Sequence, residues 1–380
     1  PDGRQVTFER ASDRLPDETR EIKPHPHGVE LGTLMKMLKE TPSRQVGAFL
    51  QKEFSRVSPT VCRKVCAQAK ITPRTWVKQV DSHASERIYQ ALQSVRILAP
   101  STDCLAPIGA RQILAGLLKG LKAEFYTAAS RSPAVYRGHP FQVEVGLAYG
   151  GDLPGDQQAR LIRFANRVPL LYQQSHCAIY KSVTDANWRS YGMQQSAGAL
   201  PSGSLVIMVH FASVWVPFTS ESKEAIADYD EIRKEVGLAV RECARKLQAF
   251  IRRRKRTQRE GERRSIFLRY VPEVTSALSS ITGVANKQLH DKLMAIALRR
   301  TELADREFDE HGRVIKKSPR PSALGDDNTI VVERESAGPG MDDTLFDADE
   351  RKIIGTKRKQ RNARSTSKRK NRNRRKRRAS

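Results

Sequence analysis

A lysine stands at a point where it could contact a phosphate group. Lys223 lies in the segment 218–223 (FTSESK), between the apolar run 205–211 and a long stretch of helical periodicity. A lysine at a strand-to-helix junction can direct its ammonium group at a phosphate, as a point charge on a flexible stem. The commoner explanation is an exposed lysine in the first turn of a helix, although the helix dipole mildly disfavours it there. The residues alone favour this second explanation.

A second segment combines aromatic and basic side chains. Residues 187–191 (NWRSY) place Trp188 and Tyr191 around Arg189. Such a set suits nucleic acid, because arginine binds phosphate while aromatic rings pack on sugars or bases. Trp188 and Tyr191 are equally well explained as core residues of a sheet domain, and the sequence leaves both interpretations open.

A helical region at 41–98 carries basic residues that could hold a DNA backbone, although an ordinary solvated face is favoured. These residues are Lys52, Arg56, Arg63, Lys64, Lys70, Arg74 and Lys78.

No complete enzyme or metal signature is present. The sequence contains no GxxxxGK[ST], no GxGxxG after a strand, no HExxH and no GxSxG. His25 and His27 each follow a proline and have no further ligands at metal spacing, which favours an extended connector. His210, inside an apolar run, is interpreted as a hydrogen-bonded sheet residue. We therefore predict no catalytic residue and no metal site in this chain.

Composition and charge exclude several classes of protein. The chain has 380 residues, 38% of them hydrophobic and 29% charged, which is typical neither of a membrane protein nor of a wholly disordered one. Its net charge of +26 divides unevenly: residues 351–380 hold 16 Lys/Arg and no acid, whereas residues 301–350 hold 14 acids and 6 bases. We expect an acidic linker at 301–350 and a basic disordered tail at 351–380. The tail could bind nucleic acid, serve as a nuclear address, or be merely solvated. The odd count of five cysteines, with no CxxC pair, favours thiols in a reducing compartment.

Hydrophobic periodicity predicts an α+β fold. Residues 29–98 read as short helices with Ser/Pro start signals. A helix follows at about 113–121, then a half-buried alternating strand at 141–149, a strand at 160–172 broken at Pro169, and a buried strand at 205–211. A long helix, capped by Ser220, is expected at about 221–255, with a weaker helix at about 266–298. The fold class is thus a small all-helical domain, then an α+β domain with a long C-terminal stalk helix, then the tail.

Several segments together resemble one family, the B subunit of DNA topoisomerase VI, a type IIB topoisomerase. The resemblance covers about residues 15–300 and implies the C-terminal two thirds of that protein. The segments are KPHPHGVELGTLMKML (23–38), FLQKEFSRV (49–57), APSTDCLAPIG (99–109), PAVYRGHPFQVEVGLAYGG (133–151), RFANRVPLLY (163–172), NWRSYG (187–192) and HFASVWVPFTSESKEAIADY (210–229).

The resemblance implies an assignment of domains. Residues 1–30 correspond to the end of an ATPase domain of the gyrase, Hsp90, histidine kinase and MutL (GHKL) type, and residues 31–98 to a helix-two-turns-helix domain. Residues 101–300 correspond to a transducer domain, with the stalk helix at about 221–255 and a docking segment for the A subunit at about 265–300. The nucleotide-binding motifs of the family are expected upstream of Pro1, so ATP and Mg²⁺ would be bound mainly there.

The resemblance also implies roles for individual residues. Lys223 matches the family's lysine that touches the γ-phosphate of ATP, which reverses the preference stated above. The segment NWRSY is similar to a DNA-contact motif, Trp-Lys-x-Tyr, with Arg189 in place of lysine, so Trp188, Arg189 and Tyr191 are the expected DNA contacts. The expected contacts with the A subunit, which supplies the cleaving tyrosine, are Ile266, Phe267, Tyr270 and Val271.

The implied function is to bind double-stranded DNA and to couple ATP binding and hydrolysis to double-strand passage, in relaxation and decatenation. The implied assembly is a homodimer of B subunits within an A2B2 heterotetramer, without a membrane, in the cytoplasm or nucleoid of a prokaryote or the nucleus of a eukaryote. Two alternatives stay open: a non-ATPase adaptor of similar fold for a meiotic DNA-cleaving partner, and a basic chromatin-binding protein.

Overall fold

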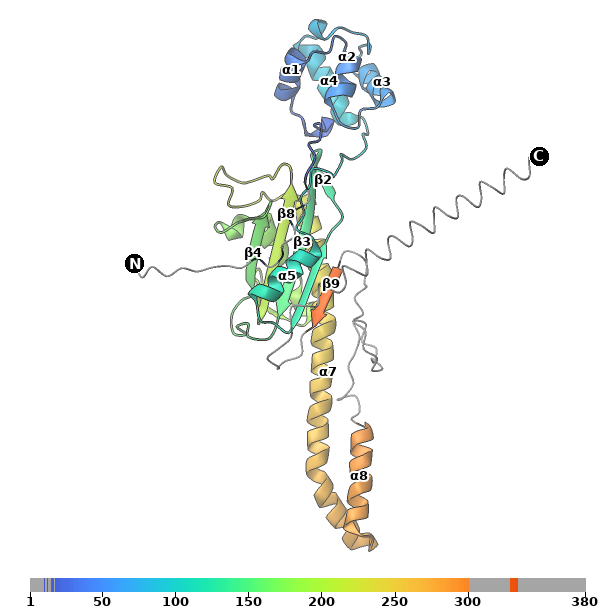
Figure 1. Cartoon of the computed structure of the whole chain (residues 1–380), viewed down its shortest axis with the longest axis vertical. Helices are drawn as coiled ribbons and strands as arrows, with labels where there is room; N and C mark the ends of the chain where they lie inside the picture. Colours follow the sequence, from blue (N-terminus) through green and yellow to red (C-terminus); the bar gives the residue numbers. More distant parts are fainter. Residues whose placement is uncertain (1–9, 11, 13–14, 17, 301–328, 334–380) are drawn as a thin grey trace, which may run out of the picture. The chain divides into compact units, whose positions relative to one another are not determined.

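A computed structural model of the chain describes residues 10, 12, 15–16, 18–300 and 329–333. Most of the predicted linker, and the whole of the predicted basic tail, lie outside the described residues. The described residues form an α+β fold, as predicted, in which a group of helices precedes a mixed sheet and a long helix (Figure 1). Within them, no helix is both long and apolar enough to cross a membrane.

The helical region has its own core. It comprises α1 (Leu31–Glu40), α2 (Val46–Glu53), α3 (Pro59–Gln68), α4 (Ser82–Ser94) and two short 3-10 helices, Pro26–Gly28 and Val77–Gln79. Two helices begin at polar residues that cap them: Ser58 accepts the N–H of Val61, and Asp81 accepts that of Ala84. The apolar positions at helical spacing meet in one cluster, whose largest fully buried side chains are Leu34, Phe49, Leu50, Ile88 and Leu92.

In the described part of the chain, seven strands form one sheet in the order β5-β4-β8-β3-β1-β9, with β2 beside β3. Neighbours are antiparallel except β4 and β8, which are parallel. A separate pair, β6 and β7, is antiparallel. The bounds are β1 Phe125–Ser130, β2 Ala134–Tyr136, β3 His139–Tyr149, β4 Arg160–Ala165, β5 Val168–Pro169, β6 Gln194–Gln195, β7 Pro201–Ser202, β8 Leu205–Ser213 and β9 Thr329–Glu333.

Helices cover both faces of the sheet. Helix α6 (Ala178–Thr184) and the first half of α7 (Asp230–Thr282) pack with Val145 and Leu147 on one face, whereas α5 (Ala110–Gly120) packs with Ala148 on the other. Strand β3 was predicted to be half-buried, and this is wrong, because α5 covers the face expected to meet water. A Cβ atom at Gly146 would lie 2.6 Å from Ile113 Cγ2, so glycine allows α5 to approach the strand closely.

The long helix differs from its prediction at both ends. Ser220 does not cap it; α7 begins at Asp230 and extends over 53 residues, about 80 Å at 1.5 Å per residue. It continues past 255 because arginine, lysine, glutamine and glutamate are good helix formers. It ends at Gly283, whose φ is +68°. The segment expected to begin at about 265 is therefore partly inside α7, and α8 (Asn286–Arg300) runs back beside the end of α7 (Figure 1).

Two other expectations are corrected. The strand predicted at 160–172 is a hairpin of β4 and β5, because Asn166 and Arg167 both have positive φ, as two-residue hairpin turns require. The linker predicted throughout 301–350 contains β9, which pairs with β1; Thr127 Oγ1 donates to Ile330 O at 2.9 Å. The consecutive β-branched residues Ile330, Val331 and Val332 favour a strand, but its pairing with β1 depends on a contact distant in the sequence.

Candidate functional site

Lys223 lies at the tip of a hairpin-like loop between β8 and α7. Phe218 pairs with Ile226, and the N–H of Ala227 donates to Pro217 O at 2.7 Å. Lys223 is exposed and has a φ of +56°. Its predicted place in the first turn of a helix is wrong, because the backbone forms hydrogen bonds across this loop instead of forming a helix. Within the described residues, its ammonium group makes no ion pair, so it is free to meet an anion.

The stem of this loop is fixed to the sheet domain. The N–H of Ala178, the first residue of α6, donates to Ile226 O at 2.9 Å, and Ile226 itself is fully buried. Only two residues, Asp228 and Tyr229, separate the loop from α7. The loop that carries Lys223 is thus rigid at its base and continuous with the long helix. This loop, residues 217–227, is called the Lys223 hairpin below.

The three residues of the predicted DNA contact have different positions. Trp188 is completely buried, and its indole N–H donates to Val183 O at 2.8 Å. It is a core residue and cannot contact DNA in this structure, which corrects its predicted role. Tyr191 is half-buried with its ring edge against Trp188. Arg189 is exposed, and its Nε donates to Gln195 O at 2.8 Å, so Arg189 is the one exposed side chain of the three.

The four predicted partner contacts divide between two faces of α7. Ile266, Phe267 and Tyr270 expose 55%, 48% and 54% of their surface, whereas Val271 exposes 6%. Residues 266, 267 and 270 share one helix face, because side chains three and four residues apart are neighbours. Val271 is buried near the α7–α8 hairpin and is not available to a partner, which corrects that part of the prediction.

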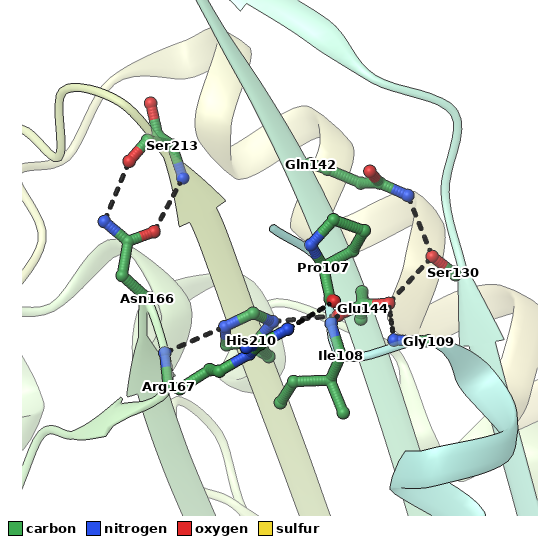
Figure 2. Close-up of polar contacts among 10 residues, drawn as sticks. All are labelled: Pro107, Ile108, Gly109, Ser130, Gln142, Glu144, Asn166, Arg167, His210 and Ser213. Carbon is green, nitrogen blue, oxygen red and sulfur yellow. Dashed lines mark hydrogen bonds and ion pairs between the residues drawn. The ribbon is translucent and has the colours of Figure 1, made fainter. Parts of the chain in front are cut away.

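A buried carboxylate organises the centre of the sheet (Figure 2). Glu144 Oε2 accepts the backbone N–H of Ile108 at 2.7 Å and lies 2.8 Å from His210 Nδ1. Its Oε1 accepts the N–H of Gly109 at 2.8 Å and the hydroxyl of Ser130 at 2.9 Å. Burial raises the pKa of Glu144, but the hydrogen bonds from His210 and from the two backbone N–H groups outweigh it and hold the pKa below its usual value.

The ring of His210 has a defined arrangement of protons. Its Nε2 accepts the backbone N–H of Arg167 at 3.0 Å, so Nδ1 carries the proton that it donates to Glu144. Arg167 also donates from its guanidinium to Pro107 O at 2.9 Å. His210 is thus a satisfied sheet histidine, as interpreted from the sequence. The network, which sequence reasoning missed, ties the start of α5 to β3, β8 and the β4–β5 turn.

One feature of the sequence could have indicated that Glu144 is buried and paired. It is an acid inside the strand FQVEVGLAY, where its neighbours on the same face are the small residues Gly146 and Ala148. Small residues on a strand face predict that another element packs closely on that face. A charged side chain buried under such an element must be paired. All polar contacts of the network are internal, so it positions the backbone and offers no open site for a substrate.

The described residues offer no alternative chemistry of the metal or disulfide type. Among them, no group of three or more His, Cys, Asp or Glu side chains could hold a metal ion. The five cysteines all carry free thiols, four of them buried.

A sheet covered by helices on both faces, with an exposed lysine on a loop continuous with a helix of about 80 Å, defines an α+β domain in which that loop is joined directly to a long helix. Comparison with known proteins agrees with this class. Residues 100–263 match the family described as topoisomerase VI B subunit, transducer. The B subunit of type 2 DNA topoisomerase 6 from Methanosarcina acetivorans is 43% identical over 281 residues, which are 74% of this chain and 45% of the relative.

Other relatives carry the same description. The B subunit of type 2 DNA topoisomerase 6 from Methanococcoides burtonii is 44% identical and covers 73% of this chain and 45% of the relative. The B subunit from Sulfurisphaera tokodaii is 32% identical, and the match covers 83% of this chain and 60% of the relative. Among solved structures, the B-subunit of the DNA gyrase from Myxococcus xanthus matches with a TM-score of 0.23 and 21% identity, over 35% of this chain and 38% of that one. This last likeness is too weak to support a conclusion.

The chain therefore belongs to the family of topoisomerase VI B subunits, and residues 100–263 are its transducer region. The resemblance drawn from the sequence is confirmed. The chain spans between 45% and 60% of the length of these three curated relatives.

Proposed function

We propose that this chain is the coupling part of a topoisomerase VI B subunit, which carries a nucleotide signal from an ATP-binding part to a DNA-cleaving A subunit. The observation that carries the proposal is the position of Lys223, exposed at the tip of a rigid hairpin two residues before α7. A cation in that place can pair with a γ-phosphate and lose its partner on hydrolysis.

The residues present fit the phosphate of ATP, but not the whole cofactor. Lys223 supplies one exposed point charge without an ion pair in the described residues, which suits a phosphate. The described residues hold no cluster of carboxylates or histidines for a metal ion. We place Mg²⁺ and the rest of the nucleotide in an ATP-binding part of the same protein, where bound ATP supplies the free energy of the cycle.

The proposed assembly contains two B subunits, two A subunits and double-stranded DNA. Arg189 and the basic residues of the helical region are the candidate DNA contacts. Ile266, Phe267 and Tyr270, exposed together near the end of α7, form the candidate surface for the A subunit. Apolar side chains of this size on one helix face suit a stable protein contact.

The test uses the full-length B subunit assembled with its A subunit. Wild-type protein should relax supercoiled DNA and decatenate linked circles only with ATP. Lys223→Ala should bind ATP with nearly unchanged affinity, but should hydrolyse it and pass strands at least about tenfold more slowly, as when one charge-stabilising group is removed. Lys223→Arg, which keeps the charge, is the matched control. Unchanged ATP turnover in the alanine variant would contradict the role of Lys223.

A wild-type assembly that supports DNA cleavage without any dependence on ATP would instead favour the adaptor. In that case the Lys223 hairpin would have no nucleotide to sense, and both Lys223 variants would behave as wild type.

A further inference from the structure

Four charged side chains surround the point where the Lys223 hairpin passes into α7. Asp228 lies between the two elements, Arg233 is in the first turns of α7, and Lys181 and Asp185 belong to α6 and its C-terminal end. Lys181 Nζ lies 2.9 Å from Asp228 Oδ2, and Arg233 Nε lies 3.5 Å from Asp228 Oδ1. The Nη2 of Arg233 also pairs with Asp185. The four residues form one chain of ion pairs, called the α6 latch below.

The latch ties the junction between the Lys223 hairpin and α7 to helix α6. Helix α6 is fixed, because Ala178, Ile179 and Val183 are buried in the sheet core. The Lys223 hairpin ends at Ala227, directly before Asp228, and α7 begins directly after Tyr229. Ile226 and Ile232, on either side of this junction, are buried in the same core. A pull on Lys223 therefore acts on the short segment between them, where Asp228 is held by its ion pairs with Lys181 and Arg233.

The geometry of the latch explains why an arginine suits position 233. Its guanidinium reaches Asp228 through Nε and Asp185 through Nη2, so one rigid fork holds two carboxylates on different elements. A lysine carries a single ammonium point and cannot reproduce that arrangement. Asp228 and Arg233 are about one quarter and one third exposed, so their pairing is less screened than that of fully exposed ions.

A second arginine holds α7 to the sheet without involving the hairpin. Arg131, directly after β1, pairs with Glu235 at 3.4 Å and with Glu242 at 3.8 Å. Both carboxylates belong to α7. Because these pairs fix the same helix to the sheet domain but do not touch residues 217–228, they separate simple attachment of α7 from communication with the hairpin.

We propose that Asp228 and Arg233 are positioning residues that transmit movement of the Lys223 hairpin to the long helix. This inference rests on the proposed function, in which Lys223 meets the γ-phosphate of ATP. When Lys223 is drawn toward the phosphate, Asp228 changes its position relative to Arg233, and α7 changes its angle to α6. Lys181 and Asp185 provide the fixed reference for that movement.

The experiment compares ATP hydrolysis with strand passage in the full-length B subunit assembled with its A subunit. Asp228→Asn should keep ATP hydrolysis within about twofold, since Lys223 is untouched and a partly exposed pair is weak. The number of strand passages per ATP should fall about tenfold, the size expected for a residue that carries coupling. Asp228→Glu should restore most of the loss, whereas Arg233→Lys should not.

Glu235→Gln is the matched control. It weakens the attachment of α7 to the sheet and should leave the number of passages per ATP unchanged. Equal losses in Glu235→Gln and Asp228→Asn, or parallel losses of hydrolysis and passage in Asp228→Asn, would overturn the inference, because both results indicate a general loosening of the domain. If Asp228→Asn does not fold, as judged by its thermal melt, the charge-conserving pair Asp228→Glu and Arg233→Lys decides the question.

The outcomes also separate this inference from the proposed function. If the wild-type assembly shows no ATP-dependent strand passage, the proposed function itself is wrong. If the wild type is active and Lys223→Ala is impaired, but Asp228→Asn and Arg233→Lys pass strands with wild-type efficiency per ATP, the proposed function stands and the role of the α6 latch is refuted.

Discussion

Glu144 of β3 and His210 of β8 lie directly opposite each other in the sheet, with Oε2 and Nδ1 2.8 Å apart and both side chains fully buried. The carboxylate has four hydrogen-bond partners, and the ring has one on each nitrogen. Such a network stabilises the fold only while every donor and acceptor in it has a hydrogen-bond partner.

The first prediction concerns the stability of this network toward acid. The folded pKa of Glu144 lies below the value of 4.5 that applies to the unfolded chain. Its contribution to the free energy of unfolding is therefore present above about pH 4.5, and is lost as the pH falls through the folded pKa. Glu144→Gln should lower the free energy of unfolding at pH 7 by about 3 kcal/mol, because His210 and two backbone N–H groups lose their anion.

The measurement is urea unfolding between pH 3 and pH 7, a range that follows from the direction of this pKa shift. The variant should lose less stability on acidification than the wild type. Glu40→Gln, at an exposed position of α1, is the control and should change little. Equal stability of wild type and Glu144→Gln at pH 7 would show that the network contributes nothing.

The second prediction distinguishes the two interpretations of Trp188. Because the side chain is fully buried, Trp188→Ala should lower the free energy of unfolding by about 3–5 kcal/mol. Trp188→Phe should cost less, since it loses only the hydrogen bond to Val183 O and part of the ring. Trp76, which is 49% exposed, is the control, and its change to alanine should cost at most about 1 kcal/mol. Chemical denaturation measures all three. A stable Trp188→Ala protein with weakened DNA binding would restore the contact role.

The third prediction assigns DNA contact to Arg189. Arg189→Glu should weaken binding to duplex DNA at least about tenfold at low salt, since it removes a cation and adds an anion beside the phosphates. The slope of log affinity against log salt concentration should become shallower by about one or more. Arg189→Lys keeps the charge and should bind nearly as the wild type does. Fluorescence anisotropy at several salt concentrations measures both quantities, and equal affinities for Arg189→Glu and wild type would refute the contact.

The fourth prediction separates the two faces of α7 near its end. Phe267→Asp should cost about 1–3 kcal/mol in binding to the A subunit and leave the melting temperature of the chain itself nearly unchanged. Val271→Asp should instead destabilise the α7–α8 pair, because it buries an unpaired carboxylate. Calorimetric titration and thermal melts give the two readouts. Wild-type affinity for the A subunit in Phe267→Asp would exclude this face as the docking surface.

Local signals of the sequence determined much of this protein. Ser58 starts a helix where its Ser-Pro pair predicted one, since a cap depends on residues three positions away. The alternation along 141–149 identified β3, and the apolar run at 205–211 identified β8. The family followed from long matching segments, and Lys223 was singled out by type and place before any fold was known.

Only the tertiary structure decided which residues are buried and which distant residues are in contact. It placed Trp188 in the core and Glu144 beneath α5, because burial depends on what packs against a residue and not on its own type. It replaced the first turns of the predicted long helix with the Lys223 hairpin, whose pairing of Phe218 with Ile226 outweighs local helical preference. It also brought Asp228, Arg233 and α6 together from positions about 50 residues apart, because ion pairs between distant segments have no period or spacing in a sequence.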